Sequence, residues 1–191
     1  MRTILSLALV LLPLSAAVAL EGKKPPKKMI ALATADTKYA RIGCPAAWTL
    51  EISSPDSLSA HCFLGSIWFL KDKPERWADI TYAFVNTSDR PGRSFAAVLR
   101  DKDCATNTYP QLAGGFCGRR IGPITVAGKE GVLLQTGPNR EQTHKTLEIL
   151  AEAAGRVYLI ELAAPVDQFE SYMPLFGAAL ARFEPIPPKT H

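Results

Sequence analysis

The chain has 191 residues, 47% of them hydrophobic and 21% charged, and its formal net charge at pH 7 is +4. The excess positive charge lies near the N-terminus, because residues 29–191 hold 17 Lys+Arg and 17 Asp+Glu. The charged residues before position 29 are Arg2, Glu21, Lys23, Lys24, Lys27 and Lys28. The neutral remainder argues against a nucleic-acid-binding protein, whose basic residues cluster on the fold.

An apolar N-terminal segment predicts export. Arg2 precedes the apolar run 4–18, and the small residues Ala17 and Ala19 occupy the two positions that a signal peptidase reads. We predict a signal peptide over 1–19 and a secreted or periplasmic protein. The run is shorter than the about 20 residues of a membrane span, so we expect no membrane span after cleavage, with an uncleaved anchor as the alternative.

A basic linker is expected next. Residues 20–38 begin with a charged, proline-containing stretch without apolar period, which is typical of a linker. A solvated linker is the favoured interpretation, and weak contact with an anionic surface is the alternative, through Lys23, Lys24, Lys27 and Lys28. Residues 39–184 show no internal repeat and are long enough for one core, so they predict a single α/β domain, followed by a proline-rich tail over 185–191.

The domain begins with an expected hairpin. Residues 39–52 and 58–70 have strand composition and flank the turn residues 53–57. Folding the two strands about this turn places Cys44 nearly opposite Cys62.

All four cysteines follow the expected signal peptide, and their even number indicates an oxidising compartment. Of the three pairings that four cysteines allow, we favour the two sequential ones, Cys44 with Cys62 and Cys104 with Cys117. A metal site is the alternative for Cys44, His61 and Cys62. It is disfavoured because adjacent side chains of a strand point to opposite faces, so no metal site is predicted.

The middle of the domain alternates between element types. Residues 77–85 predict a strand whose alternate apolar residues share one face. A helix is expected over 93–103, with Ser94 as its N-cap. Residues 119–135 then predict a hairpin with its turn at 127–131.

The last third predicts two strands and a helix. Residues 143–150 and 156–162 form a hairpin around Gly155, which can take positive φ. Apolar residues then recur three and four apart from Phe169 onward, which places them on one helical face. Because proline lacks the backbone donor, we expect a short first turn and then a main helix with Pro174 in its first turn.

The resulting order is hairpin, strand, helix, hairpin, hairpin, helix. This order, with the segments 45–48, 128–134, 156–165 and 169–183, resembles the PsbP-like superfamily. The resemblance implies an α+β fold in which an antiparallel β-sheet is flanked by helices, as an α/β/α sandwich. The family includes a photosystem extrinsic subunit, a nuclear-transport partner and bacterial envelope proteins, so the resemblance also implies a role in binding or assembly.

The sequence offers few catalytic candidates. It contains no G-x-S-x-G motif, and the cysteines are assigned to disulfides. The two histidines of the domain, His61 and His144, are expected to be packed or solvated. We therefore predict no catalytic residue and no cofactor. An exported hydrolase using His144 or His61 is an alternative, and it requires a carboxylate or hydroxyl within hydrogen-bond reach of the imidazole.

A recognition surface is the remaining candidate site. Trp77, Tyr109, Arg119 and Arg120 lie near expected strand ends and the loop closed by the second disulfide. Burial of the aromatic residues in the core is the alternative.

These features together predict an exported, non-catalytic binding or assembly protein of the cell envelope, with an unidentified envelope protein as its partner. A small-ligand carrier is a further alternative, and it requires a sizeable apolar pocket between the sheet and a helix.

Overall fold

The computed structural model describes residues 30–52, 59–64, 77–86, 94–106, 117–136 and 143–187. Several sequence-based predictions fall outside these residues: the signal peptide over 1–19, the contact of Lys23, Lys24, Lys27 and Lys28 with anionic surfaces, the placement of Tyr109, and the end of the tail.

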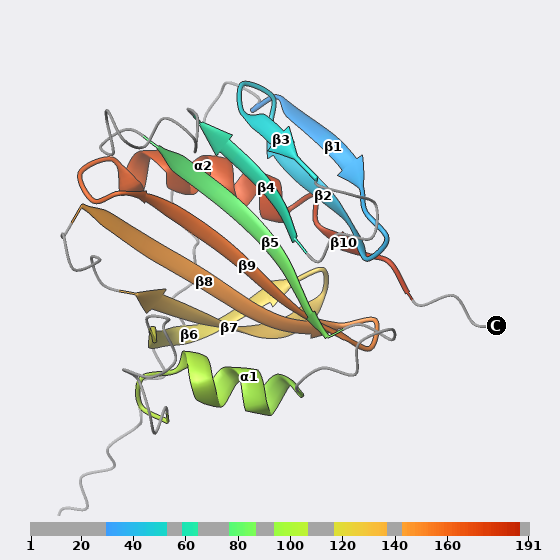
Figure 1. Cartoon of the computed structure of the whole chain (residues 1–191), viewed down its shortest axis with the longest axis vertical. Helices are drawn as coiled ribbons and strands as arrows, with labels where there is room; N and C mark the ends of the chain where they lie inside the picture. Colours follow the sequence, from blue (N-terminus) through green and yellow to red (C-terminus); the bar gives the residue numbers. More distant parts are fainter. Residues whose placement is uncertain are drawn as a thin grey trace, which may run out of the picture.

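A seven-stranded antiparallel sheet forms the centre of the molecule (Figure 1). Its strand order is β3-β4-β5-β9-β8-β7-β6. The strands are β3 (Thr49–Glu51), β4 (Ser59–Leu64), β5 (Ala78–Asn86), β6 (Arg119–Val126), β7 (Lys129–Thr136), β8 (His144–Ala153) and β9 (Arg156–Pro165). The two longest, β8 and β9, are neighbours, and they position the residues discussed below.

A second, three-stranded sheet has the order β1-β2-β10 and comprises β1 (Leu32–Asp36), β2 (Ala40–Pro45) and β10 (Glu184–Pro185). Strand β1 lies within the linker predicted over 20–38, so the ordered fold begins earlier than residue 39. The alternating Ala and Thr residues of β1 carry little strand signal on their own. The strand forms because its backbone pairs with β2 in register from Leu32 opposite Pro45 to Asp36 opposite Arg41.

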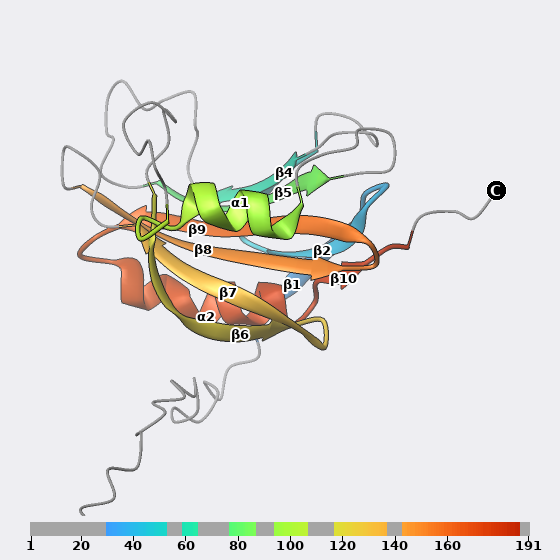
Figure 2. The same ribbon diagram turned by 90° about the horizontal axis from the view of Figure 1, so that it is seen from below.

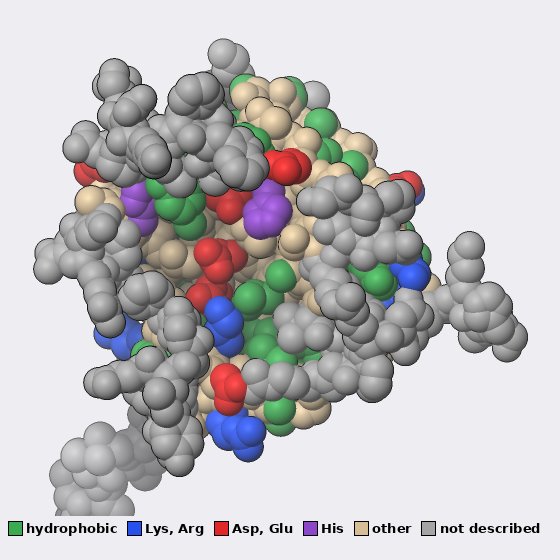
Figure 3. Space-filling model, in the orientation of Figure 1, with side chains coloured by type: hydrophobic (Ala, Val, Ile, Leu, Met, Phe, Trp, Pro, Cys, Tyr) green, Lys and Arg blue, Asp and Glu red, His purple; other side chains and the backbone are tan. Residues whose placement is uncertain are grey.

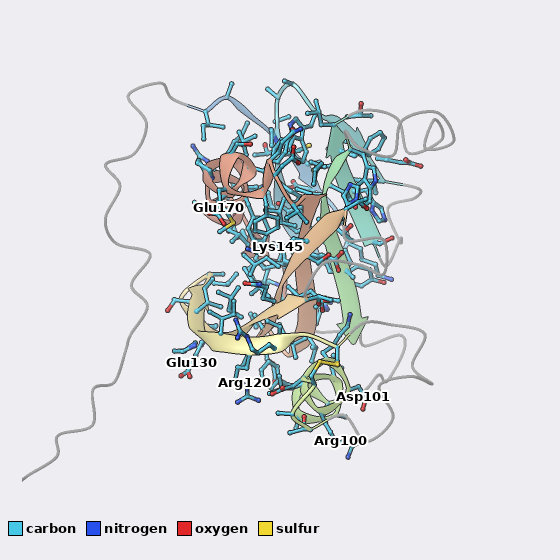
Figure 4. The ribbon with its side chains drawn as sticks, turned by 90° about the vertical axis from the view of Figure 1, so that its left-hand side faces the viewer. Arg100, Asp101, Arg120, Glu130, Lys145 and Glu170 are labelled. Atoms are coloured by element: carbon cyan, nitrogen blue, oxygen red, sulfur yellow. A yellow bond between two sulfur atoms is a disulfide. The ribbon has the colours of Figure 1, made fainter. Side chains whose placement is uncertain are left out.

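The two helices lie on opposite faces of the large sheet (Figure 2). Helix α1 (Phe95–Lys102) packs its Val98 against Leu150 and Val157. Helix α2 (Phe169–Leu180) covers the other face, together with β2. Figure 4 shows Lys145 of β8 beside Glu170 of α2, with Nζ and Oε1 3.7 Å apart. The predicted α+β class, a mostly antiparallel sheet with helices, is confirmed.

The alternation of side chains along each strand decides what the two faces contain. In β9, Tyr158, Ile160 and Leu162 are buried on the α2 face, while Leu159 and Glu161 point to the other face. The α2 face is an apolar core, and its largest fully buried side chains include Tyr82, Tyr158, Phe176, Ile42, Ile149 and Leu162.

The hairpin of β8 and β9 forms as the sequence predicts. Its turn consists of Ala154 at φ 50° and Gly155 at φ 70°, both left-handed. Glycine at the second position carries no Cβ penalty there. The turn fixes the register of the hairpin and thereby places Glu148 directly opposite Glu161.

The first predicted hairpin is partly wrong. Strand β3 pairs with β4, while the turn expected at 53–57 lies outside the described residues, and β2 belongs to the smaller sheet. Leu50 is therefore the residue opposite Cys62, and Cys44 belongs to a different sheet. The disulfide predicted between Cys44 and Cys62 is not formed in the structure, where both thiols are free and buried.

The other predicted disulfide, between Cys104 and Cys117, is present. It ties the C-terminal end of α1 to the beginning of β6. The N-terminus of α1 is also as expected, because the Ser94 hydroxyl accepts a hydrogen bond from the Ala97 amide at 3.3 Å.

Helix α2 differs from the prediction at Pro174. The helix runs without a break from Phe169 to Leu180 and carries Pro174 in its interior. Proline removes one backbone hydrogen bond, but Phe169 and Phe176 on either side of it are both buried against the sheet. That packing outweighs the missing bond. Within the described ranges, no helix is long and apolar enough to cross a membrane.

Candidate functional site

Ionisable side chains gather on the face of the large sheet that lies opposite α2. We call this the polar face and define it by His61, Asp79, Thr81, Glu148 and Glu161. Figure 3 shows acidic and histidine side chains clustered in the middle of this face. Such residues stand out because they alternate along their strands with fully buried apolar residues such as Ile80 and Ile160.

Strand register aligns four of these residues. His61 of β4 lies opposite Thr81 of β5, Thr81 opposite Glu161 of β9, and Glu161 opposite Glu148 of β8. Side chains directly opposite on neighbouring strands are about 5 Å apart at Cβ and therefore interact. The polar face is thus a continuous row across four adjacent strands.

At the β4 end of the row, three side chains form a hydrogen-bonded group. The Thr81 hydroxyl donates to Asp79 Oδ2 at 2.6 Å and lies 3.1 Å from His61 Nδ1. His61 Nδ1 is itself 3.5 Å from Asp79 Oδ2. The hydrogen bond to Asp79 raises the pKa of His61, and burial opposes that rise in part. Asp79 therefore favours the protonated imidazole.

At the β8 end, helix α1 supplies a cation. Lys102 Nζ lies 3.0 Å from Glu148 Oε2, and the Glu148 side chain is only 4% exposed. The Thr136 hydroxyl donates to Glu148 Oε1 at 3.3 Å. Glu148 is therefore a buried carboxylate with an ion-pair partner, which offsets part of the cost of its burial.

Glu161 lies between these two groups and has the most perturbed carboxyl of the row. Burial, then the negative charge of Glu148, raise its pKa to about 7. Asp79 adds to the rise, whereas Lys102 and His61 oppose it. Among the described residues, no cation lies within ion-pair distance of the Glu161 carboxylate. The carboxyl of Glu161 therefore exchanges a proton near neutral pH.

Trp77 and His144 border the polar face. Their rings stack with centroids 4.4 Å apart and planes inclined by 19°. His144 Nδ1 lies 3.1 Å from the Thr143 hydroxyl, and the residue is buried. Of the two histidines considered from the sequence, His144 is packed against an aromatic ring, and His61 lies beside the Asp79 carboxylate.

Arg119 and Arg120 lie elsewhere, on the edge strand β6. They line a surface hollow of about 440 Å³ together with Asp103 and the disulfide residue Cys104. Arg120 is engaged within the fold, because its Nη2 lies 2.9 Å from the buried carboxylate of Asp103. Three strands separate β6 from β5, so the structure does not bring Trp77 together with the two arginines as the predicted recognition surface requires.

The arrangement offers little to a metal ion or an apolar ligand. In the part of the chain that the structure describes, no group of three His, Cys, Asp or Glu side chains is placed to hold a metal ion. The space between α2 and the sheet is filled by large buried side chains, among them Tyr82, Phe176 and Phe183. That packing leaves a small-ligand carrier without the apolar pocket it requires at this place.

Sequence analysis did not single out Glu148 and Glu161, although a signal was present. Glu148 is the only acidic residue in the apolar segment 147–150, and Glu161 is the only acidic residue in the apolar segment 157–162. Once the turn is centred on Ala154 and Gly155, counting back and forward along the hairpin places the two glutamates opposite each other. The contribution of Lys102 is not visible in this way, because it depends on how α1 packs.

Comparison with known proteins concerns the fold. No protein-family model matches the chain, and no curated protein matches it in sequence. Among solved structures, it is similar to LpqN, which is involved in cell envelope biogenesis of Mycobacterium tuberculosis, at 13% identity and TM-score 0.50 over 82% of this chain and 91% of that chain. This likeness shows the fold alone.

Two further structures match with lower scores. Cyanobacterial PsbP (CyanoP) from Synechocystis sp. PCC 6803 is 13% identical, with TM-score 0.47 over 87% of this chain and 99% of that chain. PA94 from Pseudomonas aeruginosa, a protein of unknown function, is 16% identical, with TM-score 0.45 over 84% of this chain and 99% of that chain.

Proposed function

We propose that the protein is an exported, non-catalytic binding or assembly protein of the cell envelope, and that it acts through the polar face. The observation that carries the proposal is the row formed by His61, Thr81, Glu161 and Glu148. Ionisable side chains in the middle of a sheet destabilise a fold unless they are paired. Glu161 is half-buried without a cation partner among the described residues, so its position is better explained by binding than by stability.

Helix α1 is part of the proposed surface. It covers the face at Leu150 and Val157 and supplies Lys102 to Glu148. The predicted α/β/α sandwich belongs to the proposal as well, with α1 as the helical layer beside the partner and α2 as the layer that closes the core.

Two observations support export. The predicted signal peptide precedes the fold, and the disulfide between Cys104 and Cys117 is of a kind that persists in oxidising compartments. A location outside the cytoplasm is therefore part of the proposal, and cell fractionation with an N-terminal sequence of the mature protein tests it. A mature protein that retains residues 1–19 in the cytoplasm would contradict it.

The binding role is tested by capturing partners from envelope extract with the protein from Leu20 onward, produced under oxidising conditions. Wild type is compared with Glu161→Gln and with Glu130→Gln, which makes the same charge change on the exposed hairpin of β6 and β7 (Figure 4). We expect one envelope protein to be retained in stoichiometric amount by wild type and Glu130→Gln and lost with Glu161→Gln. Equal retention by all three removes the polar face from the proposal.

A second candidate function, an exported hydrolase, is favoured by one observation. His61 meets the stated requirement, since Nδ1 lies within reach of the Thr81 hydroxyl and the Asp79 carboxylate. A carboxylate beside one ring nitrogen orients the imidazole and leaves the other nitrogen to accept a proton from water. His144 is stacked on Trp77, and its Nδ1 lies 3.1 Å from the Thr143 hydroxyl.

The hydrolase is tested with a panel of chromogenic esters and glycosides. This function predicts turnover by wild type and His144→Gln and at least a hundredfold lower turnover by His61→Gln, because general base catalysis contributes about 10²–10⁴-fold. Turnover that survives His61→Gln, or no turnover on any substrate, leaves the binding role as the explanation of the polar face.

A further inference from the structure

The charges of the polar face are unbalanced. Lys102 is paired with Glu148, and His61 is shared with Asp79 through Thr81. Glu161 lies between these pairs without a cation of its own among the described residues. Within the same part of the chain, Asp79 Oδ1 is buried and accepts no hydrogen bond, although Oδ2 accepts one from Thr81. Two acceptor groups on one face are therefore left without donors.

The charged groups around Glu161 favour a positively charged ligand. Four charged groups act on the Glu161 carboxyl: Glu148 of β8, Asp79 of β5, His61 of β4 and Lys102 of α1. Glu51 of β3 extends the row, opposite His61. Carboxylates thus outnumber cations among these groups, and an anionic partner would be repelled.

We propose that the polar face docks a basic segment of a protein partner, placing a lysine or arginine side chain against Glu161 and Asp79. This inference rests on the proposed function and names the chemistry of the partner. Such a side chain complements the charge of the face, because an ammonium or guanidinium group supplies several donors at once and an arginine fork matches a carboxylate with two parallel hydrogen bonds.

Docking at this position is coupled to a proton. The free protein holds a proton on Glu161 below pH 7, because burial and Glu148 raise the pKa of that carboxyl to about 7. A bound cation favours the ionised carboxylate, so binding releases this proton. Affinity then falls as the pH is lowered, and protonation of His61 acts in the same direction by adding a positive charge to the face.

The size of the effect follows from linkage. If the bound cation returns Glu161 to an ordinary carboxyl pKa, affinity falls about tenfold between pH 8 and pH 6, since the proton must be removed at pH 6 before the cation can bind. The face is therefore expected to hold its partner at neutral or alkaline pH and to release it in acid.

The inference is tested with capped peptides of one length, built from Gly–Lys, Gly–Ser or Gly–Glu repeats. Binding to the protein from Leu20 onward is measured by calorimetry at pH 8 and pH 6, and the contact surface by amide chemical shifts. We expect saturable binding of the Gly–Lys peptide alone, with shifts at His61 and Thr81, about tenfold weaker affinity at pH 6, and proton release at pH 7 that varies with the buffer.

Variants locate the binding. Glu161→Gln is expected to lower the affinity for the Gly–Lys peptide about five- to tenfold at pH 8 and to remove most of the proton release. Glu130→Gln, at an exposed position of β7, is the matched control and is expected to change the affinity less than twofold. Equal binding by Glu161→Gln and Glu130→Gln, or affinity that rises in acid, overturns the inference. The inference is also overturned if the amide chemical shifts of the polar face change with protein concentration in the absence of peptide, because the face would then bind a second copy of the chain.

The test is separable from that of the proposed function. If envelope capture depends on Glu161 while the Gly–Lys peptide does not bind, the polar face is a binding surface for a partner of other chemistry, and this inference alone fails. If the peptide binds and the capture does not depend on Glu161, the proposed function fails at this face.

Discussion

The two faces of the seven-stranded sheet are built from the same strands and have opposite character. In β9, Ile160 is 1% exposed in the core beneath α2, while its neighbour Glu161 points to the polar face. In β8, Ile149 and Glu148 show the same contrast, and both are nearly completely buried. Burial alone therefore does not distinguish the faces. The α2 face is stabilised by apolar packing, whereas the other face keeps buried charge at a cost to stability.

The largest expected effect comes from breaking the apolar face. Phe176→Ala removes a side chain that is 2% exposed beneath α2 and leaves a cavity. We expect the free energy of unfolding to fall by about 3–5 kcal/mol, measured by urea denaturation followed by circular dichroism. Val166→Ala, at a residue that is 44% exposed, is the control and is expected to change it by less than about 0.5 kcal/mol. Similar losses for both variants would show that the core does not lie under α2.

The second prediction concerns the support of the polar face. Replacing Cys104 and Cys117 together by alanine removes the covalent bond between the end of α1 and β6, while the bridge between Asp103 and Gly118 and the Arg120–Asp103 ion pair remain. We expect a loss of about 2–4 kcal/mol under oxidising conditions, because the open chain regains loop entropy when unfolded. Added reductant should destabilise wild type and leave the variant unchanged. Wild type that is insensitive to reductant would contradict the disulfide.

The third prediction uses pH to separate the faces. Burial raises the folded-state pKa of Glu161 to about 7, above its unfolded value, so the folded state binds the extra proton. Wild type therefore loses stability as the pH rises from about 4.3 to about 7 and is level above that. Glu161→Gln lacks this loss.

Relative to wild type, Glu161→Gln is expected to gain about 2–3 kcal/mol between pH 5 and pH 8, from thermal or urea unfolding at each pH. Glu152→Gln, on the exposed end of the same hairpin, should show no such gain. Parallel pH curves for Glu161→Gln and wild type would mean that the Glu161 carboxyl titrates normally and that the polar face carries no penalty.

The residues of the apolar face were easier to predict from the sequence than those of the polar face, and the reason is physical. Hydrophobic periodicity reports which residues share a face, so the strand 77–85, the hairpin around Gly155 and the helical residues from Phe169 were recognisable. Turn chemistry also fixed the register that brings Glu148 opposite Glu161. These are local properties of the chain.

What the sequence did not reveal depends on contacts between distant segments. Strand β2 pairs with β1 and β10 and not with β4, so the hairpin expected to place Cys44 opposite Cys62 was wrong, and both thiols are free in the structure. The fold instead places the two thiols in the core between the sheets, where a hydrogen bond between them and burial raise the pKa of Cys62. Lys102 reaches Glu148 only through the packing of α1.

The smallest expected effect lies at the β4 end of the polar face. Asp79→Asn removes the carboxylate that raises the pKa of His61, so that pKa should fall, as followed by the imidazole proton shifts in an NMR titration. The raised pKa stabilises the fold below about pH 6.5, and this stabilisation disappears as the pH rises through the folded-state value.

The stability change is limited because the pair is partly exposed and therefore screened by solvent. Asp79→Asn should lose at most about 1 kcal/mol more at pH 5.5 than at pH 9. If the pKa of His61 is unchanged in Asp79→Asn, the two side chains do not interact in solution. It would also remove the acid–imidazole group on which the hydrolase depends, and would leave Glu161 as the titrating centre of the polar face.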